Sequence, residues 1–233
     1  MPSSTVYNLL GACREPGCPL CQLEQQSVKR YLDNQFYENV NSPRWRDRLR
    51  ASLGFCHEHA WLGVDERLGD ALGYSIIYRD LLNSVLRQWE SQATTLPERA
   101  RKGRLPQPSR GWIQSLVEAL TPQKPCPVCE QRNETTRTYL GVLLEQLHTQ
   151  EMSSALQASD GLCLPHLRLA FDKARDGSAA EQLLQIHRPR LEGLKAELEE
   201  FIRKNDYQAV DEGFGKEGDA WLRAIAMVVG RRK

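Results

Sequence analysis

The sequence predicts an all-α protein, on three observations. Two long segments place apolar residues at the three- and four-residue steps of a helix. No segment alternates apolar and polar residues between turn residues, as a half-buried strand would. Hydrophobic residues make up 40% of the chain and charged residues 26%, which is the balance of a folded protein. We therefore expect helices throughout and no sheet.

The two apolar stripes predict helices around residues 74–89 and 184–201. Their members are Tyr74, Ile77, Tyr78, Leu81, Val85 and Trp89 in the first stripe, and Leu184, His187, Leu191, Leu194, Leu198 and Phe201 in the second. Both stripes are expected to pack in a core or against another helix. Pro189 interrupts the second stripe, so it marks a kink or the first turn of a new helix. His187 is expected to be buried or interfacial rather than a metal ligand.

An internal duplication organises the rest of the chain. C-P-L-C at residues 18–21 recurs as C-P-V-C at residues 126–129, and L-R-A-S-L-G-F-C-H-E-H at 49–59 recurs as L-Q-A-S-D-G-L-C-L-P-H at 156–166. With Tyr31 and Leu32 matching Tyr139 and Leu140, the two stretches share eleven identities across a single one-residue gap. We interpret them as two copies of one metal-binding repeat.

The duplication and the turn residues set the predicted domains. We expect a first unit at residues 1–95, a proline- and arginine-rich linker at 96–110, a second unit at 111–206, and a C-terminal tail and helix at 207–233. Three closely spaced glycines break the chain just before the terminal helix, which carries Trp221, Leu222, Ile225 and Val228.

Each repeat is expected to bind one metal ion. We assign Cys18, Cys21, Cys56 and His59 to the first site, and Cys126, Cys129, Cys163 and His166 to the second. Three thiolates and one imidazole are typical ligands of structural zinc, and four protein ligands leave no position open for a substrate. Within each repeat, a helical hairpin is expected to return the chain from C-x-x-H to C-P-x-C. The cofactor prediction is therefore two zinc ions.

The comparison of the repeats assigns one of two neighbouring histidines. The first repeat contains His57 and His59, but the second has Leu164 at the position of His57 and keeps His166 at that of His59. We therefore assign His59 as the ligand. A glycine stands two residues before the third cysteine of each repeat, where a tight turn would lead into the C-x-x-H helix.

An iron–sulfur cluster is the alternative cofactor. Cys13, Cys18 and Cys21 make C-x4-C-x2-C, which with Cys56 matches the spacing of a plant-type [2Fe–2S] site. The second repeat has Thr121 at the position of Cys13, so it cannot form such a site. The simplest interpretation gives both repeats the same Cys3His metal and leaves Cys13 as a free thiol.

Several functional classes lack support in the sequence. The nucleotide-binding, zinc-protease and serine-hydrolase motifs are absent, and no βαβ pattern surrounds either C-x-x-C, so we do not expect an enzyme. Lysine and arginine number 31 against 30 acidic residues, which indicates no general affinity for nucleic acid. Arginine clusters at residues 43–50 and 98–110 are the local exceptions. We interpret them as a solvated helix, anchored by Trp45 and Leu49, and a charged linker.

The expected location is the cytoplasm. The N-terminal residues M-P-S-S-T-V-Y-N-L-L-G lack a basic stretch followed by an apolar core, so no signal peptide is expected. The longest purely apolar run, at residues 224–229, is too short to span a membrane. An odd number of cysteines, seven, suits metal ligands in a reducing compartment better than disulfides.

The paired C-P-x-C and G-[FL]-C-x-x-H motifs, together with E-G-D-A-W-L-R-A-I at residues 217–225, resemble an uncharacterised bacterial family classed as a domain of unknown function. The resemblance extends from Cys18 to Gly230. It implies a bacterial, cytoplasmic protein and metal binding by the eight residues named above, but no activity.

The sequence thus favours a non-catalytic, zinc-stabilised helical protein that acts as an interaction or adaptor module, with another protein as its partner. The alternatives are a nucleic-acid-binding protein that uses the arginine clusters, and an iron–sulfur or metal-handling redox protein.

Overall fold

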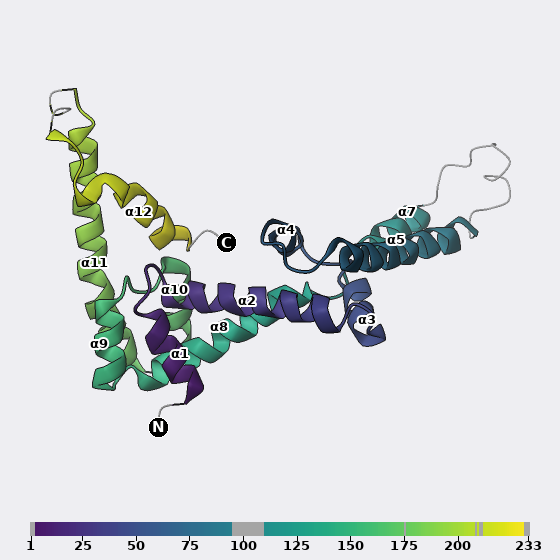
Figure 1. Cartoon of the computed structure of the whole chain (residues 1–233), viewed down its shortest axis with the longest axis horizontal. Coiled ribbons are helices and arrows are strands. Elements are labelled where there is room, and N and C mark those ends of the chain that lie inside the picture. The colour runs from purple at the N-terminus through teal and green to yellow at the C-terminus, as the bar shows by residue number, and fades with distance from the viewer. Residues whose placement is uncertain (1–2, 95–109, 175, 208, 210–211, 231–233) are drawn as a thin grey trace. The chain divides into compact units, whose positions relative to one another are not determined.

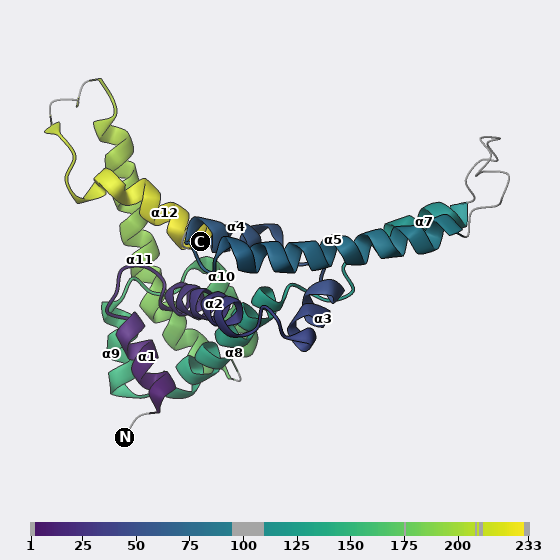
Figure 2. The same ribbon diagram turned by 45° about the vertical axis from the view of Figure 1, so that its right-hand side comes forward.

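The computed structural model describes residues 3–94, 110–174, 176–207, 209 and 212–230, and every regular element in these ranges is a helix (Figures 1 and 2). The prediction of an all-α fold is confirmed. The helices of the first half of the chain are α1 (Ser4–Ala12), α2 (Pro19–Glu38), α3 (Pro43–Ala51), α4 (His57–Asp65) and α5 (Ala71–Thr94). Those of the second half are α7 (Arg110–Ala119), α8 (Pro127–Gln146), α9 (Gln150–Ala158), α10 (Leu164–Lys173), α11 (Gly177–Lys204), the short 3-10 helix η2 (Lys216–Asp219) and α12 (Ala220–Val229).

Local sequence explains where many of these helices begin. Four helices have an N-cap side chain that accepts a hydrogen bond from the backbone N–H three residues later; the caps are Ser3, Ser42, Thr149 and Asp176. Such caps satisfy an N–H group that has no partner within the helix. Proline occupies the first position of α2, α3 and α8, where its missing N–H costs nothing.

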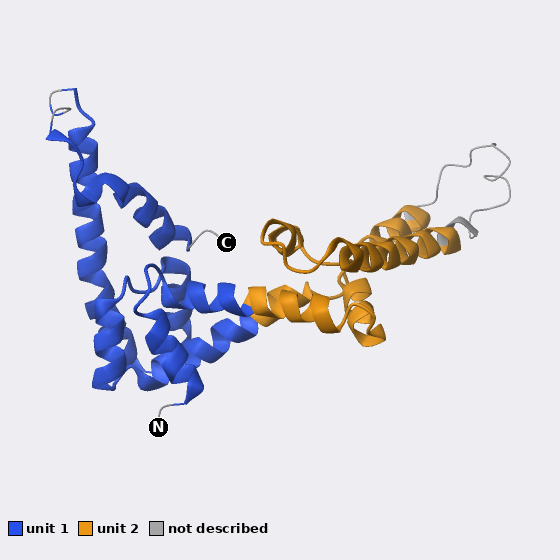
Figure 3. Cartoon of the chain, in the orientation of Figure 1, with its two compact units in different colours: residues 1–27, 133–233 blue, residues 28–132 orange. Residues whose placement is uncertain are grey.

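The chain divides into two compact units (Figure 3). Unit 1 contains residues 1–27 and 133–233, and unit 2 contains residues 28–132. Both divisions fall inside helices, in α2 and in α8. The units therefore have different bounds from the predicted domains, which followed one another along the chain. The predicted linker lies outside the described residues, apart from Arg110 at the start of α7.

Each unit has its own hydrophobic core. In unit 1, leucines from α1, α2, α8 and α9 meet residues of α10 and α11; Leu9, Leu143, Leu156 and Leu183 are fully buried. In unit 2, the core combines the second half of α2 with α3 and α5 around a group of aromatic rings. Cysteines of the two repeats appear in both cores, so the candidate ligands lie beside well-packed apolar side chains.

The two predicted stripes both lie in helices. α5 contains the first stripe, and α11 contains the second as one helix with Pro189 inside it, so no new helix begins there. His187 is buried, as predicted, and belongs to no group of candidate ligands. Beyond α11 the chain turns back through η2, and α12 lies beside α11 and α10 (Figure 1). Within the described residues, no helix combines the length and the apolar character that crossing a membrane requires.

Candidate metal centres

The eight predicted ligands come together in two groups, but in exchanged halves. Cys18 and Cys21 lie with Cys163 and His166 in unit 1, whereas Cys56 and His59 lie with Cys126 and Cys129 in unit 2. In each group the ligand atoms are all within 4.8 Å of one another. The predicted pairing of half-sites within one repeat is therefore wrong: each group joins the C-P-x-C of one repeat to the C-x-x-H of the other.

The lengths of the helices explain the exchange. α2 begins at Pro19 and continues for 20 residues, or about 30 Å at 1.5 Å per residue. The nine-residue α3 that follows is less than half as long, so α3 by itself does not bring the chain back to the start of α2. The second repeat has the same design, with 20 residues in α8 and nine in α9. A return hairpin was expected here, and a single long helix stands in its place.

All four half-sites share one local arrangement. The first cysteine of each pair directly precedes a helix, and its carbonyl oxygen accepts the first helical hydrogen bond, from the residue four positions later. The second ligand follows in the first turn of the helix, three residues on, so both side chains point the same way. Each group therefore lies at the N-terminal ends of two helices, where the helix dipole favours thiolates.

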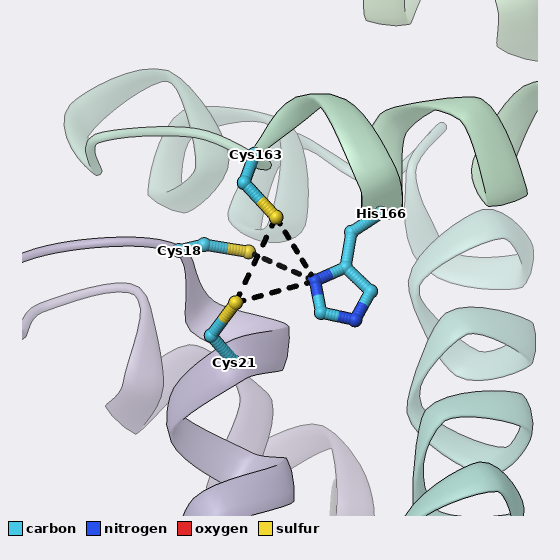
Figure 4. A group of neighbouring side chains, drawn as sticks. All are labelled: Cys18, Cys21, Cys163 and His166. Carbon is cyan, nitrogen blue, oxygen red and sulfur yellow. Dashed lines mark hydrogen bonds between the residues drawn. The ribbon is translucent and has the colours of Figure 1, made fainter. Parts of the chain in front are cut away.

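The group in unit 1 is closely spaced (Figure 4). His166 Nδ1 is 3.4 Å from Cys18 Sγ, 3.5 Å from Cys21 Sγ and 3.2 Å from Cys163 Sγ. The sulfurs of Cys21 and Cys163 are 3.7 Å apart. The imidazole thus points one nitrogen at all three sulfurs, which is the arrangement of four ligands around one ion.

The group in unit 2 repeats these dimensions. His59 Nδ1 is 3.1 Å from Cys56 Sγ, 3.4 Å from Cys129 Sγ and 3.8 Å from Cys126 Sγ, and the sulfurs of Cys56 and Cys129 are 3.6 Å apart. His57 lies outside the group, exposed and edge-on to Trp61. The structure therefore places His59, and not His57, among the candidate ligands.

The proposed iron–sulfur ligand set does not assemble. Cys56 belongs to the group in unit 2, whereas Cys18 and Cys21 belong to that in unit 1. Cys13 joins neither group; it is buried, and burial raises the pKa of its thiol to about 11. Cys13 therefore behaves as a protonated core residue.

Several thiols of the two groups have a raised pKa. Burial raises the pKa of Cys129 to about 12 and also raises that of Cys126. For Cys163, a hydrogen bond with Cys18 lowers the pKa, but a hydrogen bond with Cys21 and burial outweigh it and leave a value of about 11. A metal ion binds thiolates, so its binding must release these protons.

The environment of His166 favours a positive charge. Burial lowers its pKa, but hydrogen bonds with Cys18, Cys21 and Glu24 outweigh burial and raise the pKa to about 12. Nε2 of the ring lies 2.9 Å from Glu24 Oε1, and the Glu24 carboxylate also accepts a hydrogen bond from Thr136. A carboxylate behind a ligand histidine fixes the ring and strengthens its metal-binding nitrogen.

The corresponding contact in unit 2 is built differently. Glu58 Oε1 lies 3.7 Å from His59 Nε2, and Arg132 Nη1 lies 3.3 Å from the same oxygen. Arg132 occupies in the second repeat the position of Glu24 in the first, 108 residues later. The Glu58 side chain is 37% exposed, against 14% for Glu24. Sequence reasoning missed both carboxylates, although Glu24 follows Cys21 by one helical step of three residues.

Comparison with known proteins assigns the chain to a family. Residues 11–233 match the family of unknown function DUF6062. The chain belongs to this family. It is also 26% identical over 219 residues to an uncharacterised 23.9 kDa protein encoded in the 3′ region of xynA in Caldicellulosiruptor sp. (strain Rt8B.4), covering 93% of this chain and 97% of the relative. No solved structure matches the chain. The predicted resemblance to an uncharacterised bacterial family is thereby confirmed.

In this DUF6062 protein, α11 holds the turn that precedes Cys163. Gly161 has φ +77°, and a Cβ there would lie 3.1 Å from His187 Nε2. That nitrogen accepts a hydrogen bond from the N–H of Leu162 at 2.8 Å, while Nδ1 donates to the carbonyl of Leu183. Arg190 donates to three carbonyls at the end of α9, those of residues 156, 157 and 159. These contacts of His187 and Arg190 thus fix the backbone next to the candidate ligand Cys163.

The described arginine cluster of the DUF6062 protein is largely engaged within unit 2. Arg46 donates to the Val40 carbonyl, Arg48 pairs with Glu130 at 2.7 Å, and Arg50 pairs with Asp47 and Asp80. Trp45 and Leu49 are buried, as predicted for an anchored helix. Of the second cluster, residues 98–109 lie outside the described residues.

Proposed function

We propose that this chain is a non-catalytic protein in which two structural zinc ions, each bound by three thiolates and one imidazole, hold a helical interaction module together. The ligand spacing carries the proposal. Around a tetrahedral zinc ion with Zn–S of about 2.3 Å and Zn–N of about 2.0 Å, two sulfurs lie about 3.8 Å apart, and a sulfur and a nitrogen about 3.5 Å apart. Cys21 Sγ and Cys163 Sγ are 3.7 Å apart, Cys56 Sγ and Cys129 Sγ are 3.6 Å apart, and the sulfur–nitrogen distances run from 3.1 to 3.8 Å.

A structural rather than catalytic role follows from the ligand count. Four protein ligands complete the tetrahedron that zinc prefers, so no position is left for a water molecule or a substrate. His59 and His166 are both buried, which keeps solvent from the ligand nitrogens. Seven free cysteines, six of them in the two groups, also suit a reducing compartment such as the cytoplasm.

Because the half-sites are exchanged, each ion would join segments that are far apart in the sequence. In unit 1 the ion would join residues 142 to 148 positions apart, and in unit 2 residues 67 to 73 positions apart. Structural zinc contributes about 10–16 kcal/mol of apparent binding free energy, which is comparable to the net stability of a whole domain. The two zinc ions would therefore cross-link the two repeats at two points. Neither repeat alone would supply all four ligands of one ion.

The repeated succession of helices supports a duplicated origin. A helix of 20 residues begins at the proline of each C-P-x-C, and it is followed by a helix of nine residues and then by the helix that begins at C-x-x-H. Thr135 occupies in the second repeat the position that Ser27 occupies in the first repeat. Ser27 Oγ and Thr135 Oγ1 are 2.7 Å apart. Equivalent positions of the two repeats thus touch within unit 1, as expected when two copies of one ancestral unit interlock.

Metal analysis of the protein, purified without chelator and under anaerobic conditions, tests the proposal. We expect two equivalents of zinc per chain and a loss of helical circular dichroism when a strong chelator removes them. One equivalent or none, or the visible absorption of an iron–sulfur cluster, would contradict the assignment of zinc to both sites.

A further inference from the structure

The hairpin of α5 and α7 in unit 2 has an apolar outer face. The two helices run side by side in opposite directions (Figures 1 and 2). Six large apolar side chains of the hairpin are 43% to 63% exposed: Leu82, Leu86 and Trp89 on α5, Ile113 and Val117 on α7, and Leu120 directly after the end of α7. We call these six residues the hairpin face. No other described element of unit 2 covers them.

The hairpin face consists of two matching stripes. On α5 the three residues follow at steps of four and three, and the three residues from Ile113 to Leu120 follow at the same steps. Residues at these steps share one side of a helix. Each stripe is therefore a continuous apolar ridge, of the kind that a helix normally buries against another helix.

Both stripes lie on the same side of the hairpin. A cavity between α3, α5 and α7 is lined by Gln88 and Ser91 from α5 and by Ser115 and Glu118 from α7. At 100° per residue, each stripe lies roughly 150–170° around its helix from these lining residues. The cavity and α3 therefore occupy one side of the hairpin, and all six apolar side chains occupy the other.

The exposed area suits an interface of ordinary size. About half of each of six large side chains is exposed, which amounts to roughly 400 Å² of apolar surface. Isolated proteins rarely expose a contiguous apolar patch much larger than a few hundred Å² without a partner. A standard interface buries about 800 Å² per partner, a little more than half of it apolar, so this face supplies about the apolar area that a stable dimer needs.

We propose that the hairpin face binds the hairpin face of a second copy of this chain, so that two α5–α7 hairpins pack about a two-fold axis as a four-helix bundle. An identical hairpin offers two ridges of the same length and spacing, which a two-fold axis brings together. The exposed charged residues that flank the ridge on α5 are Arg79 and Glu90, one of each sign. Identical faces therefore do not repel each other.

The dimer goes beyond the proposed zinc binding and does not rest on it, because no ligand lies in either stripe. The experiment is sedimentation of the full zinc-loaded chain across a range of concentrations. We expect the mass of two chains at about 100 µM, since interfaces of this size bind with micromolar affinity or better. The double variant Leu86→Glu/Val117→Glu places a carboxylate in each ridge and should raise the dissociation constant by on the order of 100-fold.

The matched control is Asn83→Glu/Gln88→Glu, which adds two carboxylates to exposed polar positions of α5 outside its ridge. It should stay dimeric, with unchanged zinc content and helicity. If the ridge variant fails to fold, Leu86→Ala/Val117→Ala shortens the same side chains without adding charge and should also weaken the dimer. A monomeric wild-type chain at about 100 µM overturns the proposal, as does a folded ridge variant that stays as dimeric as its control. Neither result would affect the zinc count.

Discussion

Removing the carboxylate behind His166 should weaken the zinc site of unit 1 specifically. In Glu24→Gln the side chain keeps its shape but loses the negative charge 2.9 Å from His166 Nε2. Outer-shell carboxylates of this kind contribute 10- to 100-fold in metal affinity, or about 1.4–2.8 kcal/mol. We expect a loss near the upper end of that range, because the Glu24 side chain is only 14% exposed.

The structure supplies a matched control in unit 2. The Glu58 carboxylate is 3.7 Å from His59 Nε2, is 37% exposed and is paired with Arg132. Solvent screens such a contact, so Glu58→Gln should cost less than tenfold in affinity. The two substitutions change the same chemical group beside equivalent ligands, and the difference between them isolates the effect of distance and burial.

Competition against a chromophoric zinc chelator measures both effects. Each variant is titrated in a background that retains one site: Glu24→Gln with His59→Ala, and Glu58→Gln with His166→Ala. Circular dichroism of the loaded proteins checks that each has folded. An unchanged affinity in the first variant, or an equal loss in both, would refute the argument that Glu24 orients His166.

Three further predictions concern ligands, backbone and protons. His59→Ala should release one equivalent of zinc and His57→Ala none, as elemental analysis would show. Gly161→Ala should destabilise the chain by about 1–3 kcal/mol in denaturant unfolding, because of its positive φ and its close contact with α11, whereas Gly141→Ala, in a helix with open space around it, should stabilise it by about 0.5–1 kcal/mol. Zinc affinity should rise with pH, by up to tenfold per pH unit for each thiol that ionises on binding, because burial raises the pKa of ligand thiols, that of Cys129 to about 12. Competition titrations at several pH values measure this dependence. A zinc affinity that stays constant or falls as the pH rises would contradict the prediction.

The sequence predicted which residues form the two candidate groups better than it predicted how their halves pair. Residue type and the repeat selected all eight residues of the groups, because metal chemistry restricts which side chains can serve and the N-terminal turn of a helix fixes their local spacing. The fold class followed from helical periodicity, and His187 was correctly placed in the interior.

Which half-sites pair depends on the length of α2, which is a single helix of 20 residues and not the expected hairpin. No glycine or proline interrupts the chain between Leu20 and Ser42, and that uninterrupted run was the available signal for one long helix instead of a hairpin. Glu24 was missed for a related reason. Its role arises only when His166, 142 residues away, is brought beside it by the exchange. Contacts between distant segments follow from tertiary structure, which local patterns do not specify.

NMR of the cadmium-substituted protein would show which cysteines share an ion, and so whether the halves of the two repeats are exchanged. Each cadmium ion couples through bonds to the β-protons of the cysteines that bind it, so the spectrum assigns ligands to ions. We predict one cadmium signal that correlates with Cys18, Cys21 and Cys163, and a second that correlates with Cys56, Cys126 and Cys129. A signal that connects Cys18 and Cys21 with Cys56 would contradict the account.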